Sequence, residues 1–266
     1  MTDKDTQHSE ESHAQQPSDT AGEHAPEPAR RKGIYLLPNL FTTAALFAGF
    51  YAILAGMDGK FEAAAIAIFV AMIFDGLDGS VARLTHTSSE FGVQYDSLSD
   101  MVSFGIAPAV VAFSWMLNEL GRIGWAAAFI YASCAALRLA RFNTQVDVVD
   151  KRFFIGIASP TAAALVAGLV WSGYDAEPTS HLAALAALVT ALAGLLMVSN
   201  MRYPSFKGLD LKGKVPFVVL LGIAMAFVII TIDPPRILFL MALTYSLSAP
   251  AQWLWRKLKS IRHKTA

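Results

Sequence analysis

Four aspartates lie in two pairs within a short stretch of the chain, and their spacing is suited to binding metal ions. Asp75 and Asp78 are three residues apart, and Asp96 and Asp100 are four apart. Residues three or four apart share a face of a helix, so each pair would project from one side of its own helix. Four carboxylates held close together repel one another unless cations lie between them, and hard oxygen ligands favour Mg²⁺ or Mn²⁺. Two such ions about 3.5–4 Å apart form the arrangement that clamps a phosphoryl displacement.

Small residues and one arginine accompany the aspartates. Gly79 and Ala82 follow the first pair on the same helix face, and Gly92 lies one turn before the second pair. Their small side chains would leave space for a flat polar ligand, or they would only let helices pack closely. Arg83 offers a planar guanidinium that suits a phosphate. Together these residues predict a metal-bound phosphate ester.

The segments that carry these residues are apolar enough to cross a membrane. The 266 residues are 55% hydrophobic and 16% charged, with a mean hydropathy of +0.45, whereas soluble domains are about 45–50% apolar and about 25% charged. A membrane-spanning helix needs about 20 mostly apolar residues. Eight segments fit, and they predict an all-α transmembrane helix bundle of about eight spans: Tyr35–Met57, Ala63–Leu84, Phe91–Asn118, Ile123–Arg141, Phe153–Tyr174, Ser180–Met201, Val215–Ile232 and Ile237–Trp255.

Charge and composition divide the chain at about residue 30. Residues 1–29 are polar and lack apolar periodicity, which is typical of a disordered tail, and residues 30–266 would form the transmembrane catalytic domain. With both termini on one side of the membrane, that side collects 18 of the 21 lysines and arginines. The positive-inside rule then places the termini and the aspartates in the cytoplasm. The net charge of zero gives no reason to expect a nucleic-acid partner,.

A transporter is the alternative from a different functional class. Aspartates within membrane spans often mark ion pathways, so a cation-coupled transporter would also use them. Transporters commonly show internal repeats and helices broken near the bilayer midplane. The four aspartates here lie at the ends of their spans, and no inverted repeat is visible in the sequence. The pattern therefore favours an enzyme.

The aspartates and their neighbours also match a known pattern. Asp75-x-x-Asp78-Gly79-x-x-Ala82-Arg83, followed after eight residues by Gly92-x-x-x-Asp96-x-x-x-Asp100, resembles the signature of the CDP-alcohol phosphatidyltransferases. The resemblance implies that Asp75 and Asp96 bridge two Mg²⁺ or Mn²⁺ ions, that Asp78 binds the first and that Asp100 binds the second. It implies that Asp100 is also the general base for the incoming hydroxyl. Gly79, Ala82, Arg83 and Gly92 would line the CDP pocket, and Ser89 matches a weaker nucleotide contact.

Segments outside this signature are similar to one subfamily, the bacterial membrane-embedded phosphatidylserine synthases. They are residues 35–42, 90–98, 138–143 and 197–207, and the similarity covers most of the chain after Arg30. It implies a homodimer in the bacterial cytoplasmic membrane that transfers a phosphatidyl group from CDP-diacylglycerol to L-serine and releases CMP. Glycerol 3-phosphate, inositol phosphate and choline are the alternative acceptors. One departure concerns the acceptor, because Ala158 stands where the subfamily often has proline before Ser159-Pro160.

Four further polar residues are candidates for ligand contacts. Arg138 and Arg141 lie three residues apart at the expected inner end of the fourth span. They could hold the lipid phosphate or the carboxylate of serine, or they could only reflect the positive-inside rule. Asn39 and Thr42 share a face of the first span and could contact cytidine or the metal ligands. Hydrogen bonding between helices would explain them equally well.

Overall fold

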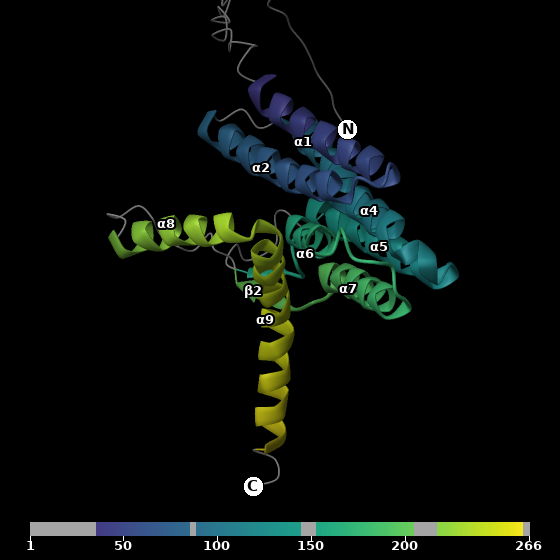
Figure 1. Cartoon of the computed structure of the whole chain (residues 1–266). Coiled ribbons are helices and arrows are strands. Elements are labelled where there is room, and N and C mark those ends of the chain that lie inside the picture. Colours follow the sequence, from purple (N-terminus) through teal and green to yellow (C-terminus); the bar gives the residue numbers. More distant parts are fainter. Residues whose placement is uncertain (1–35, 86–88, 145–152, 205–216, 263–266) are drawn as a thin grey trace, which may run out of the picture. The chain divides into compact units, whose positions relative to one another are not determined.

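The structure is a computed structural model that describes residues 36–85, 89–144, 153–204 and 217–262. The expected tail, residues 1–29, lies outside the described residues. The described part belongs to one compact unit, Gly33–Ala266. The regular secondary structure of these described residues is helical apart from one two-stranded ribbon (Figure 1). Its elements, in chain order, are α1 (Leu36–Met57), α2 (Phe61–Thr85), α3 (Glu90–Asp100), a π-helix η1 (Met101–Ile106), α4 (Ala107–Trp115), a 3₁₀-helix η2 (Leu117–Leu120), α5 (Arg122–Thr144), β1 (Phe153–Ile155), α6 (Ser159–Ser172), α7 (Ser180–Val198), β2 (Arg202–Pro204), α8 (Phe217–Ile232) and α9 (Pro234–Arg262).

The helices confirm a polytopic bundle, and the count of about eight spans is approximate. Every expected span contains a helix. Within the described residues, six helical segments are long and apolar enough to cross a membrane: Pro38–Met57, Phe61–Thr85, Glu90–Trp115, Arg122–Thr144, Ser180–Val198 and Pro234–Lys257. Helices α6 and α8 have 14 and 16 residues, fewer than the roughly 20 that cross a bilayer without tilt or thinning.

The fifth expected span begins later than its apolar run suggests. Phe153–Ile155 forms β1, which pairs antiparallel with β2. Gly156 follows with a φ of +77°, a conformation that favours glycine,, and helix α6 begins only at Ser159, with a proline in its first turn. The ribbon is tied to α9, because the buried Tyr203 donates a hydrogen bond from its hydroxyl to the carbonyl of Ser246. Burial raises the pKa of Tyr203 to about 12, so this hydroxyl keeps its proton at neutral pH.

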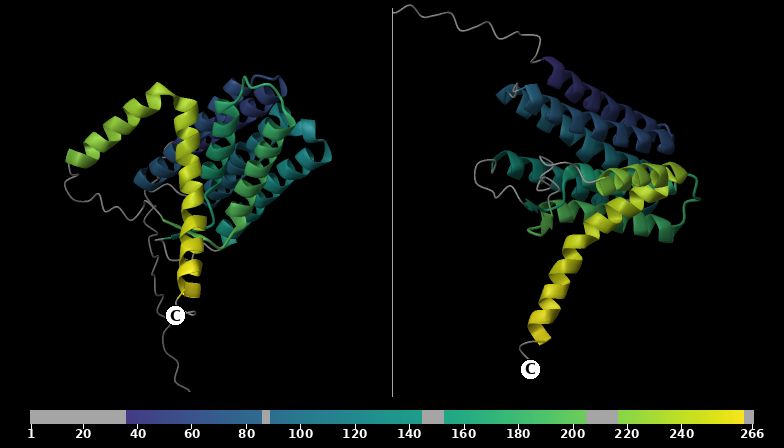
Figure 2. Two further views of the ribbon diagram at one scale, coloured as in Figure 1. Left: turned by 60° about the horizontal axis from the view of Figure 1, so that its bottom comes forward. Right: turned by 90° about the vertical axis from the view of Figure 1, so that its left-hand side faces the viewer.

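Small residues let α1 approach its neighbours closely. Helices α1 and α2 run side by side around the turn at Asp58 (Figures 1 and 2), and the α1 face towards the core carries buried alanines at 45, 48, 52 and 55. A Cβ atom added at Gly49 would lie 2.7 Å from the Cα of Ser103 in η1. Close approach through small side chains is typical of membrane helices. It holds α1 against the helices that carry the aspartates.

Candidate active site

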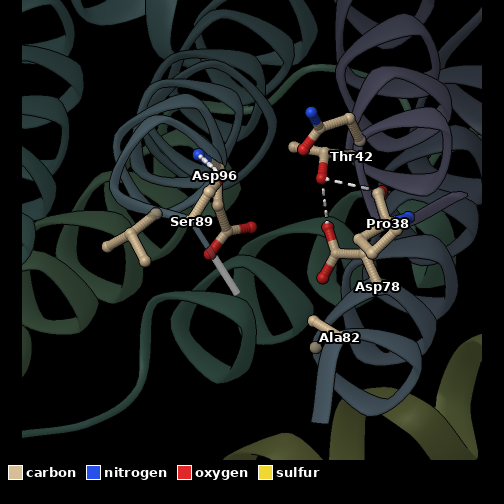
Figure 3. Close-up of a pocket in the computed structure, with 10 residues that line it drawn as sticks. Pro38, Thr42, Asp78, Ala82, Ser89 and Asp96 are labelled. Atoms are coloured by element: carbon tan, nitrogen blue, oxygen red, sulfur yellow. Dashed lines mark hydrogen bonds between the residues drawn. The ribbon is translucent and has the colours of Figure 1, made fainter. Parts of the chain in front are cut away.

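A cavity of about 160 Å³ lies among one end each of α1, α2 and α3. Figure 3 shows Asp78 and Asp96 on opposite walls of this cavity, with their carboxylates turned towards each other. The cavity brings together most of the residues that the sequence marked, and two that it did not mark, Pro38 and Val93. Its lining comprises Pro38, Asn39, Thr42, Asp78, Gly79, Ala82, Ser89, Gly92, Val93 and Asp96.

Three of the four aspartates form a compact cluster. Asp75, Asp78 and Asp96 each place one carboxylate oxygen within 4.8 Å of the others. Asp100 lies beyond this trio, and its carboxyl group is within hydrogen-bonding reach of Asp75. Asp78 is buried, with 5% of its surface exposed. The two helices therefore bring both pairs to one place, as the three- and four-residue spacings predict.

One residue of α1, Thr42, forms hydrogen bonds with both α2 and α3. The hydroxyl of Thr42 donates to Oδ2 of Asp78 over 2.7 Å and lies 3.1 Å from the carbonyl of Pro38 (Figure 3). The carbonyl of Thr42 accepts a hydrogen bond from the hydroxyl of Ser99 on α3, at 3.1 Å. Thr42 thus contacts both helices that carry the aspartates.

The start of α3 forms another part of the cavity wall. Ser89 caps the helix, and its hydroxyl accepts a hydrogen bond from the backbone N–H of Gly92 at 3.0 Å. A Cβ atom at Gly92 would lie 3.2 Å from that hydroxyl oxygen and 3.4 Å from Oδ1 of Asn39. Glycine therefore keeps this wall open, and it leaves the Asn39 amide close to the helix start.

Arg83 lies at the edge of the cavity and is exposed. Its guanidinium donates to Ser80 at 3.3 Å, and a Cβ atom at Gly79 would lie 3.5 Å from its Nη1. The side chain therefore folds back along α2 beside Gly79. From there it interacts electrostatically with Asp78.

The two arginines of α5 are in different places. Arg138 interacts electrostatically with Asp75 and Asp100, and it donates a hydrogen bond to the hydroxyl of Ser159 at the start of α6. Arg141 instead lies at the end of α7, where it donates to the carbonyl of Val198 at 3.3 Å and to Oδ1 of Asn200 at 3.4 Å. Only Arg138 is thus placed beside the carboxylates.

The donor set fits a divalent cation. Asp75, Asp78 and Asp96 offer anionic oxygens from two helices, which is the hard ligand type that Mg²⁺ and Mn²⁺ bind. The guanidiniums of Arg83 and Arg138 carry two positive charges against four carboxylates. Close carboxylates at a helix end repel strongly, so the cluster is suited to bind additional positive charge and, through it, a phosphate group.

Some residues around the site were not expected from the sequence. Ser99 and Ser159 contact Thr42 and Arg138, and Ser97 exchanges hydrogen bonds with Asn143 of α5 at 3.0–3.2 Å. Ser99 immediately precedes Asp100 and lies one turn before Ser103, so its spacing alone could have suggested a helix contact. The partners of Ser97 and Ser159 are more than 20 residues distant and carry no local signal.

Comparisons with known proteins agree on one family. A family model described as CDP-alcohol phosphatidyltransferase matches residues 35–200. A Helicobacter pylori protein named CDP-diacylglycerol–serine O-phosphatidyltransferase is 37% identical over 234 residues, which are 87% of this chain and 96% of that protein. A protein of the same name from Methanocaldococcus jannaschii is 34% identical over 180 residues, 68% of this chain and 79% of that protein. One from Mycobacterium leprae is 39% identical over 150 residues, 54% of this chain and 50% of that protein.

Proposed function

This chain belongs to the CDP-alcohol phosphatidyltransferase family, and we infer that it transfers a phosphatidyl group from CDP-diacylglycerol to L-serine, giving phosphatidylserine and CMP. The observation that carries the reaction type is the convergence of three signature aspartates in one cluster, two of which, Asp78 and Asp96, line the cavity. The relatives named as serine O-phosphatidyltransferases support serine as the acceptor. The protein is an integral membrane enzyme, and its lipid substrate is itself a membrane component.

Two divalent cations, Mg²⁺ or Mn²⁺, are part of this proposal. Asp75, Asp78, Asp96 and Asp100 would hold them, because these side chains supply the carboxylate oxygens that such ions bind,. When bound, the ions supply positive charge that stabilises the phosphates during displacement. The buried position of Asp78 supports this role, since an uncompensated buried carboxylate is costly,.

Asp100 is proposed as the general base. The hydroxyl oxygen of serine attacks the phosphorus that carries diacylglycerol, and its proton passes to the carboxylate of Asp100. The bond between this phosphorus and the CMP oxygen breaks, and CMP leaves with that electron pair. Arg138 interacts electrostatically with Asp100 and supplies positive charge beside the base.

The cavity wall would bind the nucleotide part of the donor. Gly79, Ala82 and Gly92 leave room for CDP, and Ser89 and Arg83 lie at the edge where polar groups of CDP could reach them. Asn39 and Thr42 line the same cavity from α1. Arg138 is the better candidate for binding the carboxylate of serine or the lipid phosphate, and Arg141 would act further from the carboxylates.

The setting of the enzyme in the cell completes the proposal. We propose that the chain lies in the bacterial cytoplasmic membrane with both termini and the active site facing the cytoplasm, because the basic residues predominate on that side,. Residues 30–266 would form the catalytic domain and residues 1–29 a polar tail. The family resemblance further suggests a homodimer.

An acceptor screen tests the proposed function. Purified protein is incubated with CDP-diacylglycerol, Mn²⁺ and one acceptor at a time: L-serine, glycerol 3-phosphate, inositol phosphate or choline. We expect CMP release and a new lipid with L-serine alone. Turnover with another acceptor and not with serine would contradict the acceptor assignment. Cation uptake into vesicles without any lipid product would instead support a transporter.

A further inference from the structure

Helix α1 carries no acidic residue, yet it contacts both helices that carry the aspartates through one residue. The hydroxyl of Thr42 donates to Asp78 on α2 at 2.7 Å, and the carbonyl of Thr42 accepts from Ser99 on α3 at 3.1 Å. Thr42 is 3% exposed. One buried residue therefore forms hydrogen bonds with both of the helices that carry the aspartates.

The hydroxyl of Thr42 has two acceptors within reach and only one proton. The carbonyl of Pro38, one turn earlier in α1, lies at 3.1 Å, and Oδ2 of Asp78 lies at 2.7 Å. A threonine in a helix usually donates back to such a carbonyl. A charge-assisted bond to a carboxylate is shorter and stronger, so the proton goes to Asp78. This bond fixes the orientation of the Asp78 carboxylate. The second carboxylate oxygen, Oδ1, makes no hydrogen bond with Thr42.

Further contacts fix the depth at which α3 sits against α1. Ser103, one turn after Ser99, donates to the carbonyl of Ala45 at 3.0 Å, and Gly49 allows the close approach described above. Asp100 directly follows Ser99, and Asp96 lies one turn before Asp100. The position of both α3 carboxylates relative to Asp78 therefore depends on the contacts of α3 and η1 with α1.

We propose that Thr42 is a positioning residue of the metal site, which orients Asp78 through its hydroxyl and aligns α3 through its carbonyl, so that the carboxylates of both helices meet on one divalent cation. This inference rests on the proposed function, because it assumes that the carboxylates bind metal. It assigns Thr42 a role that does not require contact with the nucleotide. Groups that hydrogen-bond to metal-binding carboxylates typically change metal affinity about 10- to 100-fold when they are removed.

Mn²⁺ binding to the full-length protein without nucleotide tests the proposal. The protein is purified in detergent, and free Mn²⁺ is followed by electron paramagnetic resonance during a titration. Thr42→Val keeps the shape of the side chain and removes the hydroxyl, and we expect Mn²⁺ to bind about 10- to 100-fold more weakly. Thr42→Ser restores the hydroxyl and should bind Mn²⁺ nearly as the unchanged protein does. The Mn²⁺ concentration for half-maximal CMP release should shift in the same order.

Thr43→Val is the matched control. Thr43 is the next residue of α1, and its hydroxyl contacts the carbonyl of Asn39 at 2.7 Å and Tyr95 at 2.9 Å rather than an aspartate. Because Thr43 contacts α3 but no aspartate, we expect Thr43→Val to weaken Mn²⁺ binding less than Thr42→Val does. Equal Mn²⁺ affinity in Thr42→Val and the unchanged protein would overturn the proposal, as would equal losses in Thr42→Val and Thr43→Val.

Two further outcomes separate this proposal from the proposed function. If the unchanged protein binds no Mn²⁺ at all, the metal site itself fails, and the positioning role of Thr42 fails with it. If the unchanged protein binds Mn²⁺ and Thr42→Val binds it equally well, only the positioning role fails. Should Thr42→Val not fold, Ser99→Ala removes the other bond to Thr42; weaker Mn²⁺ binding would support the proposal, and unchanged binding would overturn it.

Discussion

At the scale of single residues, exposure separates the aspartates of the cavity from an ordinary surface acid. Asp78 is 5% exposed and lies among other carboxylates. Asp58, in the turn between α1 and α2, is 68% exposed and forms an ion pair with Lys60 at 3.1 Å. A surface pair of this kind contributes little to stability, whereas clustered, partly buried carboxylates are costly to keep. The cavity aspartates are therefore the residues whose replacement should affect activity.

Asp100→Asn should abolish most of the CMP release while the protein still folds. Asparagine has nearly the same shape but cannot accept the proton of serine, and general base catalysis typically contributes about 10²- to 10⁴-fold. We expect kcat to fall by about that factor in assays with CDP-diacylglycerol, L-serine and Mn²⁺. Asp58→Asn serves as the control and should keep normal kcat. Near-normal CMP release by Asp100→Asn would exclude Asp100 as the base.

The sequence predicted the carboxylate cluster better than it predicted what surrounds it. The two spacings within α2 and α3 are local, and helix periodicity is enough to place each pair on one face. The bond between Thr42 and Asp78 joins residues 36 positions apart. It depends on the depth at which α1 packs against its neighbours, which is a tertiary property. For the same reason the sequence left Asn39 and Thr42 between ligand contact and helix packing.

At the scale of elements, the third expected span is composed of α3, η1, α4 and η2 rather than one continuous α-helix. The π-helix begins directly after Asp100, and π turns within helices are frequent at functional sites. Ser103 in this turn contacts α1 next to Gly49. Apolar composition predicts that a segment spans the membrane but carries no signal for a π turn, so this detail could not be read from the sequence.

Gly49→Ala should push α1 and η1 apart and weaken the metal site. The added methyl group would meet the backbone of Ser103 at 2.7 Å, and overpacking of this kind costs about 1–3 kcal/mol. We expect a lower thermal unfolding midpoint and weaker Mn²⁺ binding. Gly222→Ala in α8 is the control, because nothing lies within 4 Å of a Cβ atom there. Unchanged Mn²⁺ affinity in Gly49→Ala would show that the helix separation does not control the site.

At the scale of the whole molecule, metal removal should destabilise the fold. Four carboxylates from two helices repel one another without cations, and a ligand that binds the folded state stabilises it by about 2.7 kcal/mol at 100 times its dissociation constant. Mn²⁺ should therefore raise the thermal unfolding midpoint relative to EDTA. Asp96→Asn removes one of the proposed ligands and should show a smaller increase. Identical midpoints in Mn²⁺ and EDTA would contradict a metal site between α2 and α3.

Membrane topology depends on whether the short helices α6 and α8 cross the bilayer. In the proposed orientation, if both cross, Glu177, after α6, lies on the outer side of the membrane, and Lys259, near the end of α9, lies in the cytoplasm with most of the basic residues,. If α6 does not cross, Glu177 stays on the cytoplasmic side. If α6 crosses and α8 does not, the single remaining crossing by α9 places Lys259 outside. Glu177 therefore reports on α6, and Lys259 reports on α8 once the side of Glu177 is known.

Cysteine labelling in intact bacteria distinguishes these topologies. The native Cys134 is replaced by alanine, and single cysteines are placed at Lys60, Glu177 or Lys259, all of which are exposed. We expect a membrane-impermeant maleimide to label Lys60→Cys and Glu177→Cys in whole cells, and Lys259→Cys only after lysis. Labelling of Glu177→Cys only after lysis would show that α6 does not cross. Labelling of Lys259→Cys in whole cells would contradict a cytoplasmic carboxyl terminus, and with it the orientation that gives the soluble acceptor access to the carboxylates.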